Sequence, residues 1–245
     1  MKLTNYIAIA CIVGLTVFLT VLFTQQPTIN LTSDGQIVNE RTIVVSGNAE
    51  LEISPDIAHV YLAVNTRGNT AEEARSSNSQ ISNKVINSIK NLDISENKIE
   101  TSNYYLYEDY VWIDGRRENN GYVLEHQLKI ELDDLEKIGT LIDQTILAGA
   151  NRVNNIQFGL SDVKEAKYRD DVLTESLENA KDKAEKMAKT LNLKIIGVKH
   201  VTENNYYYTP YNYARGMDMV MAESTKIMPE DVKMSANVQV TYLIN

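Results

Sequence analysis

Two long runs of β-forming residues, joined by a short turn, constrain most strongly what this chain can fold into. Residues 98–113 (KIETSNYYLYEDYVWI) and 119–132 (NNGYVLEHQLKIEL) are extended runs, and Asp114-Gly115 lies in the connection between them. An Asp-Gly pair in such a place is a strong signal for a β-hairpin. Residues 232–244 (VKMSANVQVTYLI) alternate apolar and polar side chains, which predicts a half-buried closing strand. The chain is therefore expected to contain antiparallel sheet.

Other patterns predict the remaining elements. Further strands are expected at residues 42–53 (with a break near Gly47), 56–68, from Val153, and 194–203, and helices from Thr70, from Asp133–Glu136 and over about 163–191. In the last helix the predicted apolar seam is Leu173, Leu177, Ala180, Ala184, Met187 and Leu191. The order β-β-α-β-β-α-β-α-β-β predicts an α+β fold, with the helices on one face of a largely antiparallel or mixed sheet.

The stretch AGANRVNNIQFGLSD (148–162) raises the question of a ligand-binding loop. Gly149 follows a predicted helix and precedes a strand that begins near Val153. Glycine is the common residue where a helix ends in the left-handed conformation. An anion site would instead lie before a helix, where free N–H groups point at the ligand. The stretch is therefore interpreted as a joint between helix and strand.

The N-terminal region predicts a membrane anchor. Residues 6–23 (YIAIACIVGLTVFLTVLF) carry no charge, and 18 such residues can just span a bilayer. Lys2 precedes the run and Arg41 is the first basic residue after it, which favours a cytoplasmic N-terminus and an external domain. We therefore predict an anchor or uncleaved signal at residues 1–27, a linker at 28–40 and one domain at 41–245, in the periplasm or outside the cell. The alternative is a signal peptide that is cleaved to release a secreted protein.

Composition excludes several classes of site. The net charge of −9 argues against a nucleic-acid partner, because phosphate contacts need a basic patch. The only cysteine is Cys11, so neither an internal disulfide nor a Cys/His metal framework can form, and no cofactor is predicted. No common catalytic motif is present. His59, His126 and His200 alternate with apolar residues and are interpreted as core or rim residues, although they could still converge in space.

The segment 204–221 (NNYYYTPYNYARGMDMVM) is the candidate contact surface. It lies in a predicted irregular loop, 204–228, and its candidate residues are Tyr206, Tyr207, Tyr208, Tyr211, Tyr213, Met217, Met219 and Met221. Tyrosines provide large contact area at low entropic cost, and a long loop is often functional, although a flexible flap is an equal alternative. Its methionines could serve as an oxidation sink, which predicts that peroxide oxidises them ahead of Met187, expected to be buried.

The ordered motifs resemble the SIMPL-domain family, which includes periplasmic immunogenic proteins of bacteria. The resemblance lies in residues 44–64, 71–74, 99–107, 121–162, 178–203 and 234–244, and so extends over nearly all of the chain after Arg41. It implies an extracytoplasmic α+β domain, oligomerisation and a loose link to envelope or oxidative stress. It brings no established catalytic residues.

Three hypotheses follow for the function. The leading one is a structural or interaction protein of the cell envelope that forms homo-oligomers through the hairpin and the Tyr/Met segment. The second is a ligand- or metal-binding envelope module that uses residues 204–221. The third is an enzyme of unrecognised type, and we predict that the chain is not an enzyme.

Overall fold

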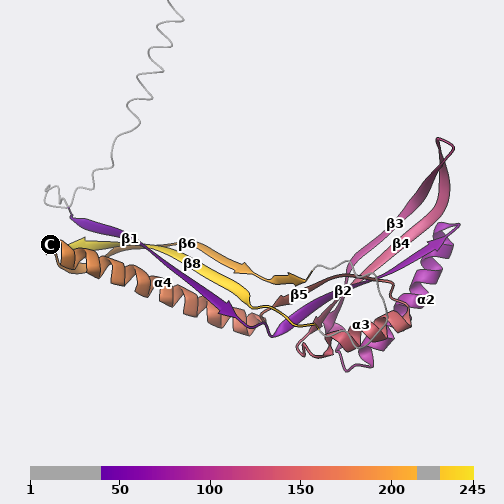
Figure 1. The fold of residues 1–245 in the computed structure, drawn as a ribbon, viewed down its shortest axis with the longest axis horizontal. Coiled ribbons are helices and arrows are strands. Elements are labelled where there is room, and N and C mark those ends of the chain that lie inside the picture. The colour runs from indigo at the N-terminus through magenta and orange to yellow at the C-terminus, as the bar shows by residue number, and fades with distance from the viewer. Residues whose placement is uncertain (1–39, 214–226) are drawn as a thin grey trace, which may run out of the picture. The chain divides into compact units, whose positions relative to one another are not determined.

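The computed structural model describes residues 40–213 and 227–245 (Figure 1). The chain divides into two units, residues 1–41 and 42–245, and all of the elements below belong to the second. In chain order they are β1 (Thr42–Ile53), β2 (Ile57–Gly68), α2 (Ala71–Lys90), η1 (Glu96–Lys98), β3 (Ile99–Ile113), β4 (Arg116–Leu132), α3 (Lys137–Ala148), β5 (Arg152–Gly159), α4 (Asp162–Thr190), β6 (Ile195–Thr209), β7 (Tyr211–Tyr213) and β8 (Val232–Ile244).

The strands form two antiparallel sheets rather than the single sheet expected from the sequence. One sheet has the order β1-β8-β6 and the other the order β3-β4-β2-β5-β7. The α+β class and the antiparallel pairing are confirmed, and helices pack on one face of each sheet. The prediction of one sheet fails because β1 pairs along its whole length with β8, its most distant strand in the sequence.

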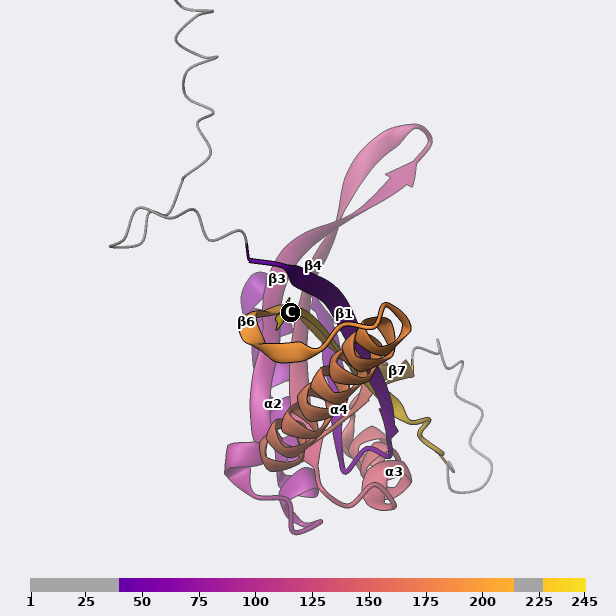
Figure 2. The ribbon, with the colours of Figure 1, turned by 90° about the vertical axis from the view of Figure 1, so that its left-hand side faces the viewer.

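Helix α4 packs on one face of the three-stranded sheet (Figure 2). The contact runs along a seam of mostly small residues. The side chains buried in the seam recur every four residues and are Val172, Ser176, Ala180, Ala184 and Ala188. Met187 and Leu191, predicted to lie in the seam, are exposed instead, at 44% and 59%. The prediction was based on the spacing of large apolar residues, whereas the close packing of α4 against β1 requires small side chains.

Gly47 explains why the seam is small. A Cβ atom built on Gly47 would lie 1.9 Å from the backbone oxygen of Ser176, a distance that no side chain can adopt. The predicted strand break at Gly47 is therefore wrong, because β1 continues through the glycine and uses it to approach α4.

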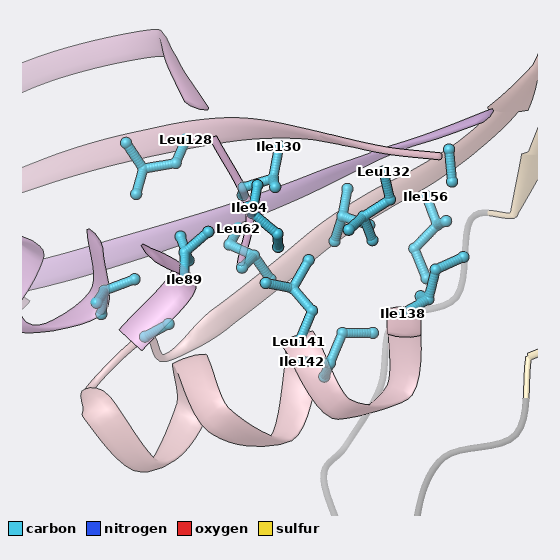
Figure 3. Close-up of a cluster of buried hydrophobic side chains, with 14 of the residues drawn as sticks. Leu62, Ile89, Ile94, Leu128, Ile130, Leu132, Ile138, Leu141, Ile142 and Ile156 are labelled. Carbon is cyan, nitrogen blue, oxygen red and sulfur yellow. The ribbon is translucent and has the colours of Figure 1, made fainter. Parts of the chain in front are cut away.

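The five-stranded sheet carries the larger core. Helices α2 and α3 cover one of its faces, and their apolar side chains meet those of β2, β4 and β5 (Figure 3). The predicted N-cap of α2 is confirmed, because the Glu73 N–H donates to Thr70 Oγ1 at 3.2 Å. The Glu73 carboxylate reaches one residue farther back than in a regular capping box, and its Oε2 accepts from the Asn69 N–H at 2.9 Å. Helix α3 begins at Lys137, and Asp134 rather than Asp133 accepts from the backbone there.

The joint at residues 148–162 is confirmed. Gly149 ends α3 in the left-handed conformation with φ of 117°, and its N–H donates to the Ile146 carbonyl at 2.9 Å. Asn151 then bonds to the backbone of β2: its Nδ2 donates to the Asn65 carbonyl at 2.7 Å, and its Oδ1 accepts from the Asn65 N–H at 2.9 Å. The asparagine side chain thus takes the place of a strand partner just before β5 begins.

The predicted anchor, residues 6–23, lies outside the described residues. Within residues 40–213 and 227–245, no helix is long and apolar enough to cross a membrane.

Candidate functional site

The tyrosine-rich segment is mostly strand, not loop. Residues 204–209 continue β6, and 211–213 form β7 at the edge of the other sheet. The predicted irregular loop is therefore wrong at its N-terminal end. Met217, Met219 and Met221 lie outside the described residues.

Two of the tyrosines in β6 have a structural role. Tyr206 and Tyr208 pair with Ala236 and Met234, whose side chains are buried on the α4 side. The Tyr208 hydroxyl accepts a hydrogen bond from the Leu160 N–H at 2.7 Å, and burial raises its pKa. The Arg169 guanidinium lies over the Tyr206 ring, 4.7 Å from its centre.

The other candidates separate from one another. Tyr211 and Tyr213 pack against the core of the five-stranded sheet, where the Tyr211 ring stacks on Phe158 at 6.1 Å. Tyr207 alone points away from α4, beside Ser235, and it is 60% exposed. The described candidates thus do not form one surface, and only Tyr207 offers its ring to a partner.

Strand β3 presents a second aromatic set. It is an edge strand of 15 residues, and its exposed aromatic side chains are Tyr104, Tyr105, Tyr107, Tyr110 and Trp112. Tyr105 and Tyr107 stack on each other at 5.4 Å, on the face of the sheet that the helices leave bare. The exposure agrees with the sequence of β3, in which no continuous apolar alternation runs through these residues.

Strands β1 and β3 each lie at one edge of their sheet, and the two edges differ in how side chains cover them. At the β1 edge, Lys183 Nζ donates to the Ser46 carbonyl at 2.9 Å, and the Asn48 N–H donates to Asn179 Oδ1 at 3.2 Å. Both partner side chains come from α4, so the helix satisfies backbone groups that another strand would need. At the β3 edge, no side chain of residues 40–213 or 227–245 bonds to the backbone of the strand. That edge is therefore open to another strand.

The three histidines do not converge. His59 pairs with Glu131, whereas His126 pairs with Val64, five residues farther along the same ladder and on the opposite face. At about 3.4 Å per residue, they are about 17 Å apart along the strands. His200 lies in the other sheet, on β6. Within the described part of the chain, no group of three or more metal-ligating side chains lies close enough to hold an ion.

His126 belongs to a polar chain beneath α2 that runs from the buried Asn78 and Ser82 to the exposed Thr101. Ser82 Oγ donates its proton to Asn78 Oδ1 at 3.0 Å. The Ser82 oxygen therefore accepts from the His126 Nδ1–H, also at 3.0 Å. Thr101 Oγ1 then donates to His126 Nε2 at 3.0 Å. Burial lowers the pKa of His126, in agreement with a neutral ring in this chain of hydrogen bonds. The arrangement links α2 to strands β3 and β4.

One feature was not singled out from the sequence: the face of the three-stranded sheet that points away from α4. Its central strand contributes Ser235, Asn237, Gln239 and Thr241, the polar half of the alternation in 232–244. A shallow hollow of ≈ 400 Å³ lies on this face, lined by Asn48, Glu50, Tyr207, Ser235 and Asn237 with two alanines. The alternation in residues 232–244 could have revealed this polar face, but it was used only to predict which side chains of the strand are buried.

The chain is similar in sequence to several known proteins. It is 25% identical over 200 residues to the uncharacterized protein YggE of Escherichia coli (strain K12), which covers 80% of this chain and 78% of that protein. YggE of Edwardsiella ictaluri is 28% identical over 147 residues, or 60% of this chain and 61% of the relative. The 26 kDa periplasmic immunogenic protein of Brucella melitensis biotype 1 is 25% identical over 190 residues, or 73% of each chain.

The family model that matches is described as SIMPL, protein of unknown function (DUF541), and it spans residues 43–242. That range holds all three described helices and all of both sheets except the first residue of β1 and the last two of β8. The resemblance in the sequence is confirmed, and the chain belongs to the SIMPL family.

Proposed function

We propose that this chain is a structural protein of the cell envelope that is anchored by residues 6–23, lies outside the cytoplasm and self-associates through the open edge of β3. The external location is supported by the periplasmic name of the Brucella relative and by the charge pattern around residues 6–23. The observation that carries the self-association is the uncovered edge of β3 with its exposed aromatic side chains.

Soluble proteins avoid exposing the free edge of a long strand. A long edge strand with exposed apolar side chains is a template for pairing, and it is normally shortened, charged or covered. Strand β1 is covered in this way by Lys183 and Asn179 of α4. Strand β3 has no such cover in the described residues, and Tyr105 and Tyr107 extend its contact area on the bare face. A second copy that adds its β3 would satisfy the free backbone groups of both strands.

Sedimentation velocity of the full-length protein over a range of concentrations tests the proposal. We expect the wild type to sediment as an assembly, and the double variant Tyr105→Lys/Tyr107→Lys to sediment as a monomer. The matched control is Ile196→Lys/Val198→Lys, which adds the same charge at exposed positions on β6, the open edge of the other sheet. A monomeric wild type contradicts the proposal, and so does dissociation of the control with the β3 variant still assembled.

Membrane anchoring needs a separate measurement. We expect the protein to stay with the membrane fraction after a high-salt wash, with residues 6–23 present in its intact mass. A soluble protein that has lost these residues would instead establish the cleaved signal.

A further inference from the structure

The bare face of the three-stranded sheet is a second exposed surface, with chemistry unlike that of β3. The pairing of β1, β8 and β6 places side chains on it in rows of three. Its central rows are Asn48, Asn237 and Asn205, then Ser46, Gln239 and Thr202. All six side chains are polar and uncharged. A face of this composition suits a ligand that is rich in hydrogen-bonding groups and carries no charge.

The amides on this face are linked to one another. Asn204 Nδ2 donates to Asn237 Oδ1 at 2.9 Å, and Asn237 Nδ2 donates to Asn48 Oδ1. Asn204 is the extra residue of a β-bulge, since pairing passes from Glu203 to Asn205, and the bulge brings it to the chain of amides. Each amide keeps a further donor or acceptor site. The donors and acceptors are therefore held in place before a ligand binds, which reduces the entropy lost on binding.

An aromatic ring stands beside these amides. Tyr207 is 60% exposed and lies in the row next to Asn237, opposite Ser235. The face of an aromatic ring carries negative potential, so it attracts the polarised C–H groups of a sugar ring, while the phenol hydroxyl stays in water. The hollow that these residues line, ≈ 400 Å³, falls within the range of about 300–1,000 Å³ usual for small-molecule sites. It is shallow, as a site for an extended chain would be.

The side chains of this face argue against anionic and lipid ligands. The charged residues of this face are Glu50, which lines the hollow, and Glu52 and Lys233 in the next row. Lys233 Nζ lies 2.9 Å from Glu52 and 3.5 Å from Glu50, so one negative charge is left uncompensated at this end of the face. Without a basic patch, the face does not suit nucleic acid or phosphate. Without contiguous apolar side chains in its central rows, it does not suit an acyl chain.

We infer that this face, centred on Asn48, Asn237 and Tyr207, is a binding site for a neutral oligosaccharide. The sugar hydroxyl or acetamido groups bond to the amides, and one ring stacks on Tyr207. The site lies on the three-stranded sheet and the self-association edge on the five-stranded one, so each can fail without the other.

Saturation-transfer NMR with the full-length protein tests the inference, because it detects weak binding through the ligand. The probes are chitotetraose, which carries acetamido groups, and cellotetraose, which carries hydroxyls alone. We expect transfer to at least one of them, and the comparison tells which group the amides recognise. No transfer to either probe at millimolar concentration overturns the inference.

The variant is Tyr207→Ser, with Tyr105→Ser as its matched control, because the two tyrosines are 60% and 59% exposed and lie on different sheets. We expect the first to weaken binding about tenfold or more and the second to leave it unchanged. Asn237→Ala gives an independent test of the amides, with circular dichroism to verify the fold. Binding that survives Tyr207→Ser, or that is lost in Tyr105→Ser, overturns the assignment to this face.

Discussion

Gly47 in β1 and Ala180 in α4 lie so close together that a Cβ atom built on the glycine would stand 2.8 Å from the Ala180 Cβ. Any side chain at position 47 therefore has to move the helix away from the sheet. We expect Gly47→Ala to lower the free energy of unfolding by about 1–3 kcal/mol, the usual cost of overpacking.

Chemical denaturation measures this cost, and Gly197→Ala is the control. At Gly197 the nearest atom to an added Cβ is Leu243 Cδ1 at 3.9 Å, an ordinary contact. That variant should keep or slightly raise the stability. Equal losses in the two variants would show that the approach of Gly47 to α4 is not what fixes the helix.

Tyr207 and Tyr208 are neighbours with opposite roles, and removing one oxygen atom from each tests them. The Tyr208 hydroxyl is the acceptor for the Leu160 N–H at 2.7 Å, so Tyr208→Phe leaves a partly buried donor without its partner. We expect a loss of about 1–2 kcal/mol in the free energy of unfolding. Tyr207 lies in solvent on the bare face, and Tyr207→Phe should change this free energy by less than about 0.5 kcal/mol.

His126 makes stability depend on pH. Burial lowers its pKa in the folded chain below the ordinary value of 6.5, so the unfolded chain binds a proton first as the pH falls. The contribution of the neutral ring is thus complete above pH 6.5 and is lost as the pH falls toward the folded pKa. We expect the free energy of unfolding to fall more steeply in the wild type than in His126→Gln between about pH 7 and pH 5. The same slope in both proteins would remove His126 as the cause.

The exposure of each methionine predicts the order in which the methionines are oxidised. Met187 was expected to be buried, but it lies outside the small-residue seam of α4 and is 44% exposed. Met228 is 67% exposed. Met234 is fully buried under α4. We expect peroxide to oxidise Met187 and Met228 at least about tenfold faster than Met234, as measured by peptide mass spectrometry. Faster oxidation of Met234 would mean that β8 opens readily from the helix.

The sequence predicted the elements well where one local signal was sufficient. Alternation placed β8 at residues 232–244, and the helix-ending glycine placed Gly149. It failed where several bulges interrupt a strand: the pairing of β6 with β8 shifts register at three places, so the alternation is lost before Tyr206. Partner choice was the second failure, because no local pattern shows that β1 pairs with β8 rather than with β2. The polar face around Asn237 exists only through that pairing.

The hairpin of β3 and β4 continues beyond the last strand that supports it (Figures 1 and 2). Strand β2 ends where Gly68 pairs with Tyr122, whereas the hairpin pairs on to Ile113 and Arg116. Arg67 binds Asp109 at 2.8 Å at the base of this two-stranded ribbon. A ribbon of two strands is only marginally stable by itself. A partner that bound this ribbon would have to order it, so we expect substitutions in the turn at Gly115 to change the affinity of such a partner without removing a contact.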